Sequence, residues 1–312
     1  MDRHSKAIEK LHLASDVRDI PSFLSNLEEL QENMDERAQN SIANGRFRYE
    51  DLNQFTFFKT PVPIELCPAA EFLRFAWPDD TRRLWELALY QAYQSQDMSV
   101  LANGLFSYGR LEFEATGRSG SGCDHCSLLR YAIDAMASND LILMRRMLPK
   151  AFGFSTNGHR ISKAGCNLLM ALIHDDALWK EKALTGARKL LQQKISLFDQ
   201  SFIIYLITMI ENDGAKSSDM LNEMARLYLK QTSIHEFHSP YLKIFSPLLH
   251  GLHHLAYHFL TSGEFAKLVE PDHPAFWKKY TAYQREAGFK SGMPLIQFTG
   301  TLEGLNGIYT MR

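Results

Sequence analysis

The feature that most constrains this chain is a series of helical amphipathic segments that runs from about Asp79 to Leu260. Within each segment, apolar residues recur at intervals of three and four, which is the spacing of one face of an α-helix. The connections are short, so neighbouring helices must run antiparallel. No tetratricopeptide or armadillo motif recurs at a fixed period. The pattern predicts an all-α fold, an irregular array of antiparallel helical hairpins that resembles a curved bundle or solenoid.

Helix boundaries are predicted from capping residues and prolines. Ile20-Pro21-Ser22 places a proline in a first helical turn, and Asn44-Gly45 ends the helix that follows. Asp79, Asp80 or Thr81 is expected to cap the next helix. Asn139-Asp140 begins a helix that stops before Pro149. Asp175-Asp176 stands at the cap position of a later helix. Asp199 is expected to cap the helix of residues 201–210. Further apolar stripes predict helices within residues 84–92, 98–113, 128–136, 183–195, 201–210, 220–228, 248–259 and 277–283.

Four segments are expected, joined into one integrated globular unit. Residues 1–54 form an N-terminal helical segment with an acidic face, and residues 79–287 form the helical array. Residues 55–78 contain four prolines and five phenylalanines, so they predict a packed, irregular connector rather than a flexible linker. Residues 288–312 are rich in glycine and predict an irregular tail. Within it 294–301 could be extended and 302–309 could turn at Asn306-Gly307, so a short β-hairpin is one alternative.

The charge balance limits the classes of partner. Lys and Arg number 34 and Asp and Glu number 36, so the chain lacks the basic character of a dedicated nucleic-acid binder. The N-terminal sequence has no apolar signal segment, and the longest apolar run, 202–210, is far shorter than the roughly 20 residues that cross a bilayer. Four cysteines are too few for a disulfide framework. These observations predict a cytoplasmic protein whose main partner is neither nucleic acid nor membrane.

Histidines are concentrated near the end of the array. Seven of the 12 histidines lie between His235 and His273, and His250, His254 and His258 recur every four residues on one helical face. This spacing is also that of paired metal ligands. However, no H-E-x-x-H motif is present, and three successive turns of one helix cannot all reach a single ion.

We therefore expect the histidine face to be half-buried against a neighbouring helix or the C-terminal tail. A metal pair completed by His235, His238 or His273, and a pH-sensitive or partner-binding contact, are the two alternatives. Under the first expectation the protein needs no cofactor and no metal.

Cys123 and Cys126 form a C-x2-C pair in the glycine-rich stretch GRSGSGCDHC. Structural zinc usually takes two such pairs, and the remaining cysteines, Cys67 and Cys166, stand alone. Zinc held with help from His125 or a distant histidine is one interpretation of the pair. A solvated loop with incidental thiols is the interpretation that we favour.

Motifs for catalysis are missing from the sequence. There is no phosphate-binding G-x-x-x-x-G-K-[ST] loop and no G-x-S-x-G nucleophile turn. The paired carboxylates Asp79-Asp80 and Asp175-Asp176 stand where helix caps belong. We therefore expect a protein that is not an enzyme and that offers a binding surface, although the sequence does not identify the residues of that surface.

Three architectural features resemble the helical immunity proteins of bacterial polymorphic-toxin systems. They are the acidic N-terminal helix with Glu28, Glu29 and Glu32, the aromatic connector ending FLRFAWPDDTRRLWELALYQAY, and the irregular helical array. The resemblance covers most of the chain and carries no diagnostic motif, so no site residue follows from it. It implies a protein that neutralises a cognate toxin by direct binding.

Two other classes of function remain open from the sequence. A tetratricopeptide-like scaffold or regulatory module would bind several partners through a concave surface. An enzyme that used the face of His250, His254 and His258 would instead carry a bound metal.

Overall fold

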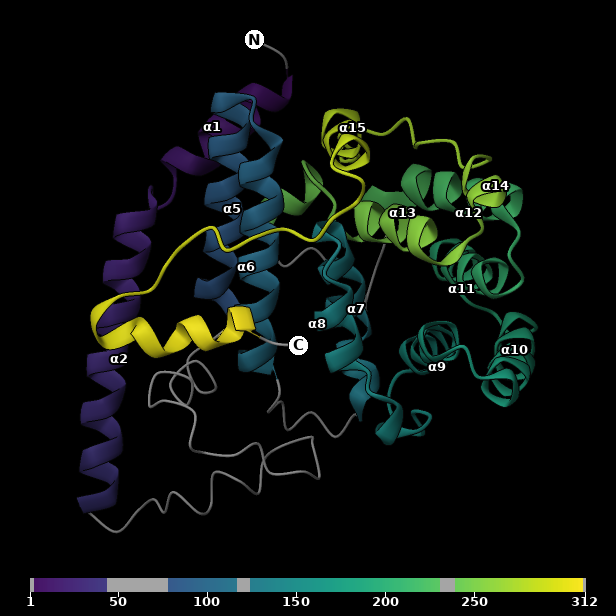
Figure 1. Cartoon of the computed structure of the whole chain (residues 1–312), viewed down its shortest axis with the longest axis horizontal. Helices are drawn as coiled ribbons and strands as arrows, with labels where there is room; N and C mark the ends of the chain where they lie inside the picture. Colours follow the sequence, from purple (N-terminus) through teal and green to yellow (C-terminus); the bar gives the residue numbers. More distant parts are fainter. Residues whose placement is uncertain (1–2, 44–77, 117–123, 231–238, 311–312) are drawn as a thin grey trace. The chain divides into compact units, whose positions relative to one another are not determined.

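The computed structural model describes residues 3–43, 78–116, 124–230 and 239–310. Every regular element within these ranges is helical, and no β-strand occurs among them, which confirms the predicted all-α fold (Figure 1). The predicted helix end at Asn44-Gly45, the connector before Pro78, and Cys67, Cys123, His235 and His238 lie outside the described residues.

The chain divides into two compact units. Unit 1 comprises Met1–Ser121 and Gly292–Arg312, and unit 2 comprises Gly122–Ser291. The first two helices of the predicted array therefore belong with the N-terminal and C-terminal segments. This grouping could not be predicted from local sequence patterns, because the tail packs on helices that lie almost 200 positions earlier in the chain.

Unit 1 contains α1 (Arg3–Leu13), α2 (Ile20–Ala43), α5 (Pro78–Ser95), α6 (Met98–Thr116) and the 3₁₀ helix η8 (Gly300–Thr310). The predicted start of α2 is confirmed, and Oδ1 of Asp19 accepts a hydrogen bond from the Ser22 backbone N–H at 2.7 Å. The predicted caps of α5 are wrong, because this helix already begins at Pro78. Oγ1 of Thr81 is buried and donates to Oε2 of Glu112 in α6 at 2.9 Å.

The core of unit 1 joins α2, α5 and α6 to the tail. Figure 1 shows η8, in yellow, lying across these helices. The buried apolar side chains of this cluster are Phe23, Leu27, Leu84, Leu87, Leu111, Ile296, Phe298, Leu302, Leu305 and Ile308. Arg110 of α6 is also buried, and its Nη1 donates to the carbonyl oxygens of Ile308 and Tyr309 at 2.9 and 3.1 Å.

The alternative of a short β-hairpin in the tail is wrong. Leu302, Leu305 and Ile308 are all buried, and their spacing of three matches the three residues per turn of a 3₁₀ helix. The Asn306 side chain replaces the cross-strand bonds of a hairpin, because it accepts from the N–H of Phe298 and donates to its carbonyl oxygen. The asparagine that suggested a turn therefore holds the preceding extended residues against the helix.

Unit 2 contains the remaining helices. In chain order they are η2 (His125–Leu128), α7 (Leu129–Ala135), η3 (Met136–Ser138), α8 (Leu141–Met147), η4 (Lys150–Phe152), α9 (Arg160–His174), α10 (Ala177–Leu191), α11 (Leu197–Ile210), α12 (Gly214–Leu227), η5 (Tyr228–Lys230), η7 (Pro240–Lys243), α13 (Pro247–Phe259), α14 (Ser262–Phe265) and α15 (Lys278–Glu286). Consecutive helices pack together as α9 with α10 and α11 with α12, and α9 also packs on α11.

Two of the predicted caps in unit 2 are confirmed and one is wrong. Asp140 accepts from the Leu143 N–H, and Asp176 accepts from the N–H groups of Leu178 and Trp179. The cap of α11 is Ser196 and not Asp199, because the helix begins at Leu197. Asp199 lies in its first turn, where Ser196 Oγ accepts from the Asp199 N–H and donates to its carboxylate.

Helix α13 crosses α7 at close range through a glycine. A Cβ added at Gly251 would lie 2.1 Å from the carbonyl oxygen of Ile133. A real side-chain atom cannot occupy that position without a backbone shift, so glycine permits this crossing. The crossing brings the histidines of α13 against η3, which directly follows α7.

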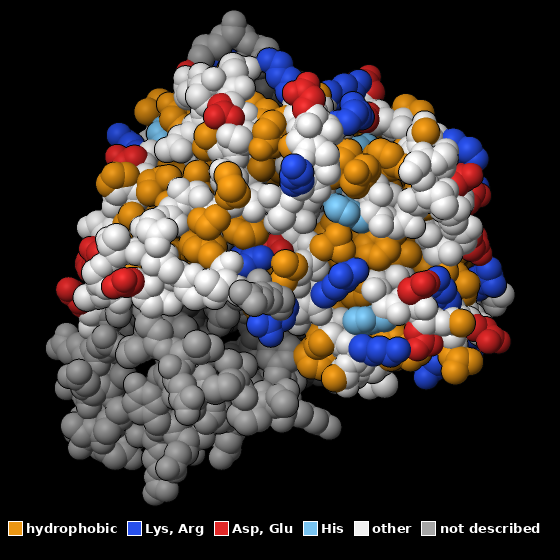
Figure 2. All heavy atoms as spheres, in the orientation of Figure 1, with side chains coloured by type: hydrophobic (Ala, Val, Ile, Leu, Met, Phe, Trp, Pro, Cys, Tyr) orange, Lys and Arg blue, Asp and Glu red, His pale blue; other side chains and the backbone are white. Residues whose placement is uncertain are grey.

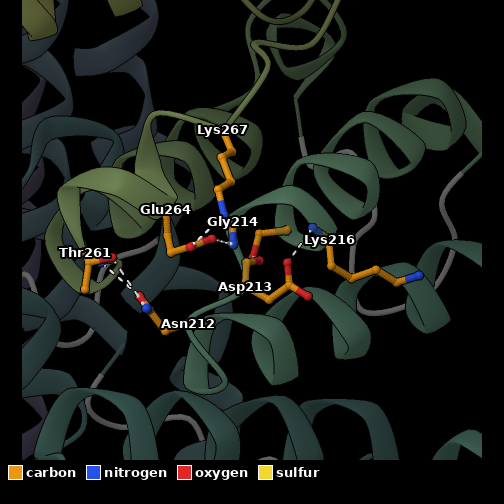
Figure 3. Close-up of polar contacts among 8 residues, drawn as sticks. Asn212, Asp213, Gly214, Lys216, Thr261, Glu264 and Lys267 are labelled. Carbon is orange, nitrogen blue, oxygen red and sulfur yellow. Dashed lines mark hydrogen bonds and ion pairs between the residues drawn. The ribbon is translucent and has the colours of Figure 1, made fainter.

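A polar junction holds the segment after α13 against the start of α12 (Figure 3). Oδ1 of Asn212 accepts from the Thr261 N–H at 2.9 Å, and Oε2 of Glu264 accepts from the Gly214 N–H at 3.0 Å. Asp213 caps α12 by accepting from the Lys216 N–H. Glu264 thus places a carboxylate at the positive end of α12, which stabilises the helix terminus.

No helix in the described ranges is both long enough and apolar enough to cross a membrane.

Candidate functional site

The histidines of α13 lie inside unit 2 rather than on a half-buried face. Ser246 caps this helix by accepting from the Leu249 N–H, and Pro247 occupies its first position. His250 and His254 are completely buried, and so is His253, which the four-residue spacing did not include. His258 alone is partly exposed. The helix is covered on several sides, so the expectation of a half-buried face is wrong for His250 and His254.

His250 uses both ring nitrogens within the protein. Its Nε2 accepts from the Trp277 N–H at 3.0 Å, and its Nδ1 lies 3.4 Å from Oγ1 of Thr281. The imidazole stacks between the rings of Phe245 and Phe276, with centroid separations of 4.6 and 4.3 Å. The expected packing against a neighbouring helix is therefore provided by α15 and the residues just before it.

His254 and His258 bond to the turn that follows α7. Nδ1 of His254 donates to the carbonyl oxygen of Met136 at 2.9 Å, and Nε2 of His258 donates to Oδ1 of Asn139 at 3.1 Å. Asn139 adopts a left-handed conformation, with φ of 58°, at the end of η3. This conformation is tolerated by asparagine better than by most residues.

A continuous chain of hydrogen bonds extends inward from His258. Nδ2 of Asn139 donates to Oε1 of Gln284 at 2.9 Å, and Nε2 of Gln284 donates to the Tyr280 hydroxyl at 2.8 Å. The Tyr280 hydroxyl then donates to the carbonyl oxygen of Ala137 at 2.6 Å. Each member of the chain is satisfied, and satisfied buried networks rigidify a core. We call His258, Asn139, Gln284 and Tyr280 the α13 network.

Burial keeps these imidazoles in the neutral form. Desolvation lowers the pKa of His250 and His253 well below the usual value, and it lowers the pKa of His254 to about 3. The pKa of His258 falls to about 4, chiefly through burial and further through the positive charge of Arg145. Such groups are suited to packing and hydrogen bonding at neutral pH.

The described candidate metal ligands are not brought together in one site. Among the described residues, no three His, Cys, Asp or Glu side chains are placed to share a metal ion. His273, one of the proposed third ligands, accepts from the Ala275 N–H through Nδ1 at 3.1 Å. Nε2 of His254 and Nδ1 of His253 are buried and have no hydrogen-bond partner among the described residues.

Asp124, between the two cysteines of the C-x2-C pair, organises the described part of that loop. Its carboxylate accepts from the Ser155 hydroxyl and from the N–H groups of Thr156, Asn157 and Cys126. Burial opposes the charged form, but these hydrogen bonds together lower the pKa of Asp124 to about 2. The carboxylate is therefore a fixed structural anion that fastens residues 155–157 to η2.

The described cysteines are free and buried, and Cys123 lies outside the described residues. Sγ of Cys126 contacts the carbonyl oxygen of Asn157 at 3.2 Å. Burial raises the pKa of the Cys166 thiol, which disfavours the reactive thiolate. The expectation of a solvated loop is thus wrong at Cys126 and His125, which are both buried.

A second candidate site lies on the surface, around the start of α10. The ring of Phe154 meets that of Trp179 edge to face at a centroid distance of 5.0 Å. Nζ of Lys182 lies 5.2 Å from the centre of the Phe154 ring, and Nζ of Lys150 lies 5.8 Å from that of Trp179. Leu178, which directly precedes Trp179, is 76% exposed. We call Lys150, Phe154, Leu178, Trp179 and Lys182 the Trp179 surface.

Local structure accounts for this arrangement. Asp176 caps α10 and pairs with Lys150 at 3.0 Å, so it fixes both the helix start and the lysine. Ala183, Ala187 and Leu190 form the buried stripe of α10, and Leu178 lies outside that stripe. Figure 2 shows Lys, Arg and His side chains next to one another over α8 and α9, on the face displayed there.

The sequence contains one signal for this site that does not belong to any motif. Leu178 and Trp179 directly follow the capping Asp176, and Leu178 is out of phase with the apolar stripe that begins at Ala183. A large apolar residue outside the buried stripe of a helix is a candidate for an exposed contact. The lysines and Phe154 could not have been assigned to the same surface without the fold.

No protein-family model matches this chain, and no curated protein or solved structure matches it significantly. The fold defines the described part of the chain as all-helical.

Proposed function

We propose that this protein acts without catalysis by binding another protein through the Trp179 surface of unit 2. The observation that carries the proposal is Leu178, which is 76% exposed and directly precedes Trp179, whose ring meets that of Phe154. Exposed apolar groups next to aromatic side chains are typical of binding surfaces, where tryptophan contributes disproportionately to affinity. The lysines on either side supply a polar rim.

The particular form that we propose is an immunity protein that neutralises a cognate bacterial toxin in the cytoplasm. Its resemblance to helical immunity proteins and its balanced net charge support this form. The engagement of His250, His254 and His258 in hydrogen bonds within unit 2 also favours a structural role for the histidines. The partner would be a toxin domain that is blocked or distorted when it is bound.

Co-expression with the product of the adjacent gene tests the proposal. We expect the two proteins to co-purify as a stoichiometric complex and the chain to restore growth of cells that express the toxin. A Leu178→Asp variant should weaken both effects. Leu197, in the first turn of α11, is 61% exposed, so Leu197→Asp is a matched control that should preserve them.

The alternatives give different results in the same experiments. Binding to several unrelated proteins without growth rescue would favour a scaffold. About one zinc or iron per purified chain by elemental analysis would favour an enzyme that uses the histidine face. Failure to co-purify with the adjacent gene product, together with failure to protect cells from it, would contradict the immunity proposal.

A further inference from the structure

The Trp179 surface lies in the most basic part of the chain. Residues 141–194 contain ten Lys and Arg but only three Asp and Glu. Two of these carboxylates are already engaged, because Asp175 pairs with Lys180 and Asp176 pairs with Lys150. This segment therefore presents more positive charge than its own carboxylates neutralise.

Several cations in this segment remain available to an outside partner. Arg145 and Arg146 at the end of α8 and Lys182 and Lys189 on α10 are exposed. Among the described residues, none of the four forms an ion pair with a carboxylate. Lys182 contacts the Phe154 ring, and a lysine ammonium carries three donors. Its outward side can therefore bind carboxylate oxygens while its inner side remains over the ring.

Of these cations, Lys182 adjoins the apolar part of the surface through the Phe154 ring, which in turn meets Trp179. Leu178 follows the cap of α10 and projects into solvent, and Trp179 is half-buried beside it. An ammonium covers one face of each ring, since Lys150 approaches the Trp179 ring and Lys182 approaches the Phe154 ring. Stacking of a nucleic-acid base requires an open aromatic face. An apolar contact with Leu178 does not require an open aromatic face.

We propose that the Trp179 surface binds an acidic segment of the partner protein, with Asp or Glu carboxylates on Lys182 and an apolar side chain on Leu178 and Trp179. This inference rests on the proposed protein-binding function and specifies the chemistry of the partner. Charge complementarity accelerates encounter and excludes basic competitors, while the apolar contact supplies the buried centre of the interface.

Selection from a displayed library of random peptides tests the proposal even while the partner is unidentified. The full-length protein is used as bait, with parallel selections on Lys182→Glu and Leu178→Asp. We expect the wild-type chain to enrich peptides rich in Asp and Glu that also contain a large apolar residue. Synthetic copies should lose on the order of tenfold in affinity for Lys182→Glu, and their binding should weaken as salt is raised.

Matched variants separate this surface from a general charge effect. Lys216→Glu in α12 and Leu197→Asp in α11 change exposed residues elsewhere in unit 2 and should leave peptide binding within about twofold of wild type. Circular dichroism of each variant checks that the fold is retained. Equal loss in the control variants, no enrichment, or enrichment of neutral or basic peptides would overturn the proposal. Tighter binding of single-stranded RNA than of the peptides, lost in Lys182→Glu, would assign the surface to nucleic acid and overturn it as well.

The outcomes also separate this inference from the proposed function. If the adjacent gene product forms a complex that Lys182→Glu and Leu178→Asp leave unchanged, the binding function stands and this surface is wrong. If the acidic peptides bind at this surface but the adjacent product neither binds nor is neutralised, the surface stands and the immunity function is wrong.

Discussion

Nε2 of His258 donates a hydrogen bond to Oδ1 of Asn139 at 3.1 Å, and this bond connects α13 to the turn after α7. Asn139 in turn donates a hydrogen bond to Gln284, so one partly exposed imidazole is linked to a buried chain of amide and hydroxyl groups. Because burial lowers the pKa of His258 to about 4, the network contains a neutral histidine at neutral pH.

The first prediction is that acidification destabilises unit 2 below about pH 6.5. The unfolded chain binds protons to histidines near pH 6.5, whereas folded His258 and His254 have pKa values of about 4 and about 3. The unfolded state therefore binds more protons as the pH falls, so the stability present above pH 6.5 is lost progressively below it. Urea unfolding at a series of pH values measures this loss.

His258→Gln identifies the contribution of the α13 network. Glutamine can donate to Asn139 but does not titrate, so we expect the loss of stability between neutral pH and pH 5 to shrink by on the order of 1 kcal/mol, a figure reduced for the partial exposure of the imidazole. His159→Gln alters an exposed histidine and is the control. An unchanged pH profile in His258→Gln would contradict the assignment.

The second prediction concerns the crossing of α13 and α7. Gly251→Ala should lower the free energy of unfolding by about 1–3 kcal/mol, because the new methyl group must displace the Ile133 carbonyl. Gly186 in α10 is the matched control, since nothing lies within 4 Å of a Cβ placed there. Gly186→Ala should raise stability by roughly 0.5–1 kcal/mol through helix propensity. Chemical denaturation measures the free energy of unfolding of both variants. Equal changes in the two variants would contradict the close approach of α13 to the Ile133 carbonyl.

Asp124 provides the third prediction. Replacing it with asparagine removes the charge that four donors share, so we expect a loss of about 1–3 kcal/mol at neutral pH. Its folded pKa of about 2 lies below the ordinary value of 3.8, so the charge stabilises the fold above pH 3.8 and that contribution is lost as the pH falls toward 2. Denaturation at neutral pH and at pH 3 should therefore show a smaller effect of Asp124→Asn in acid. Asp219→Asn, at an exposed position of α12, should change the free energy of unfolding by less than about 0.5 kcal/mol at both pH values.

A helix could be predicted from the sequence when only one of its faces is buried. Helices with one apolar face, such as α5 and α12, were predicted because their stripes contrast with polar residues on the other side. Helix α9 was missed because residues 168–173 are all buried, which removes that contrast. Helix α1 did not stand out within the N-terminal helical segment because its described buried residues are few, so no apolar stripe marks it.

The sites were harder to predict because they depend on contacts between distant segments. The four-residue spacing identified His250, His254 and His258, but it could not indicate that α15 and η3 cover them. The partners of the α13 network, Asn139 and Gln284, are 145 positions apart in the sequence. A periodicity within one helix contains no information about such contacts.

The last prediction tests the assignment of the C-terminal tail to unit 1. Leu305 is 1% exposed and packs in the cluster that contains Phe23 and Leu84, so Leu305→Ala should cost about 2–5 kcal/mol through lost burial and a residual cavity. Met293, which is 66% exposed, provides the control, and Met293→Ala should have little effect. Because each unit has its own compact set of contacts, amide hydrogen exchange should accelerate in α2 and α5 while α13 retains its protection. Equal acceleration in α13 would show that the two units unfold as one, and unchanged exchange in α2 and α5 would remove the tail from the core of unit 1.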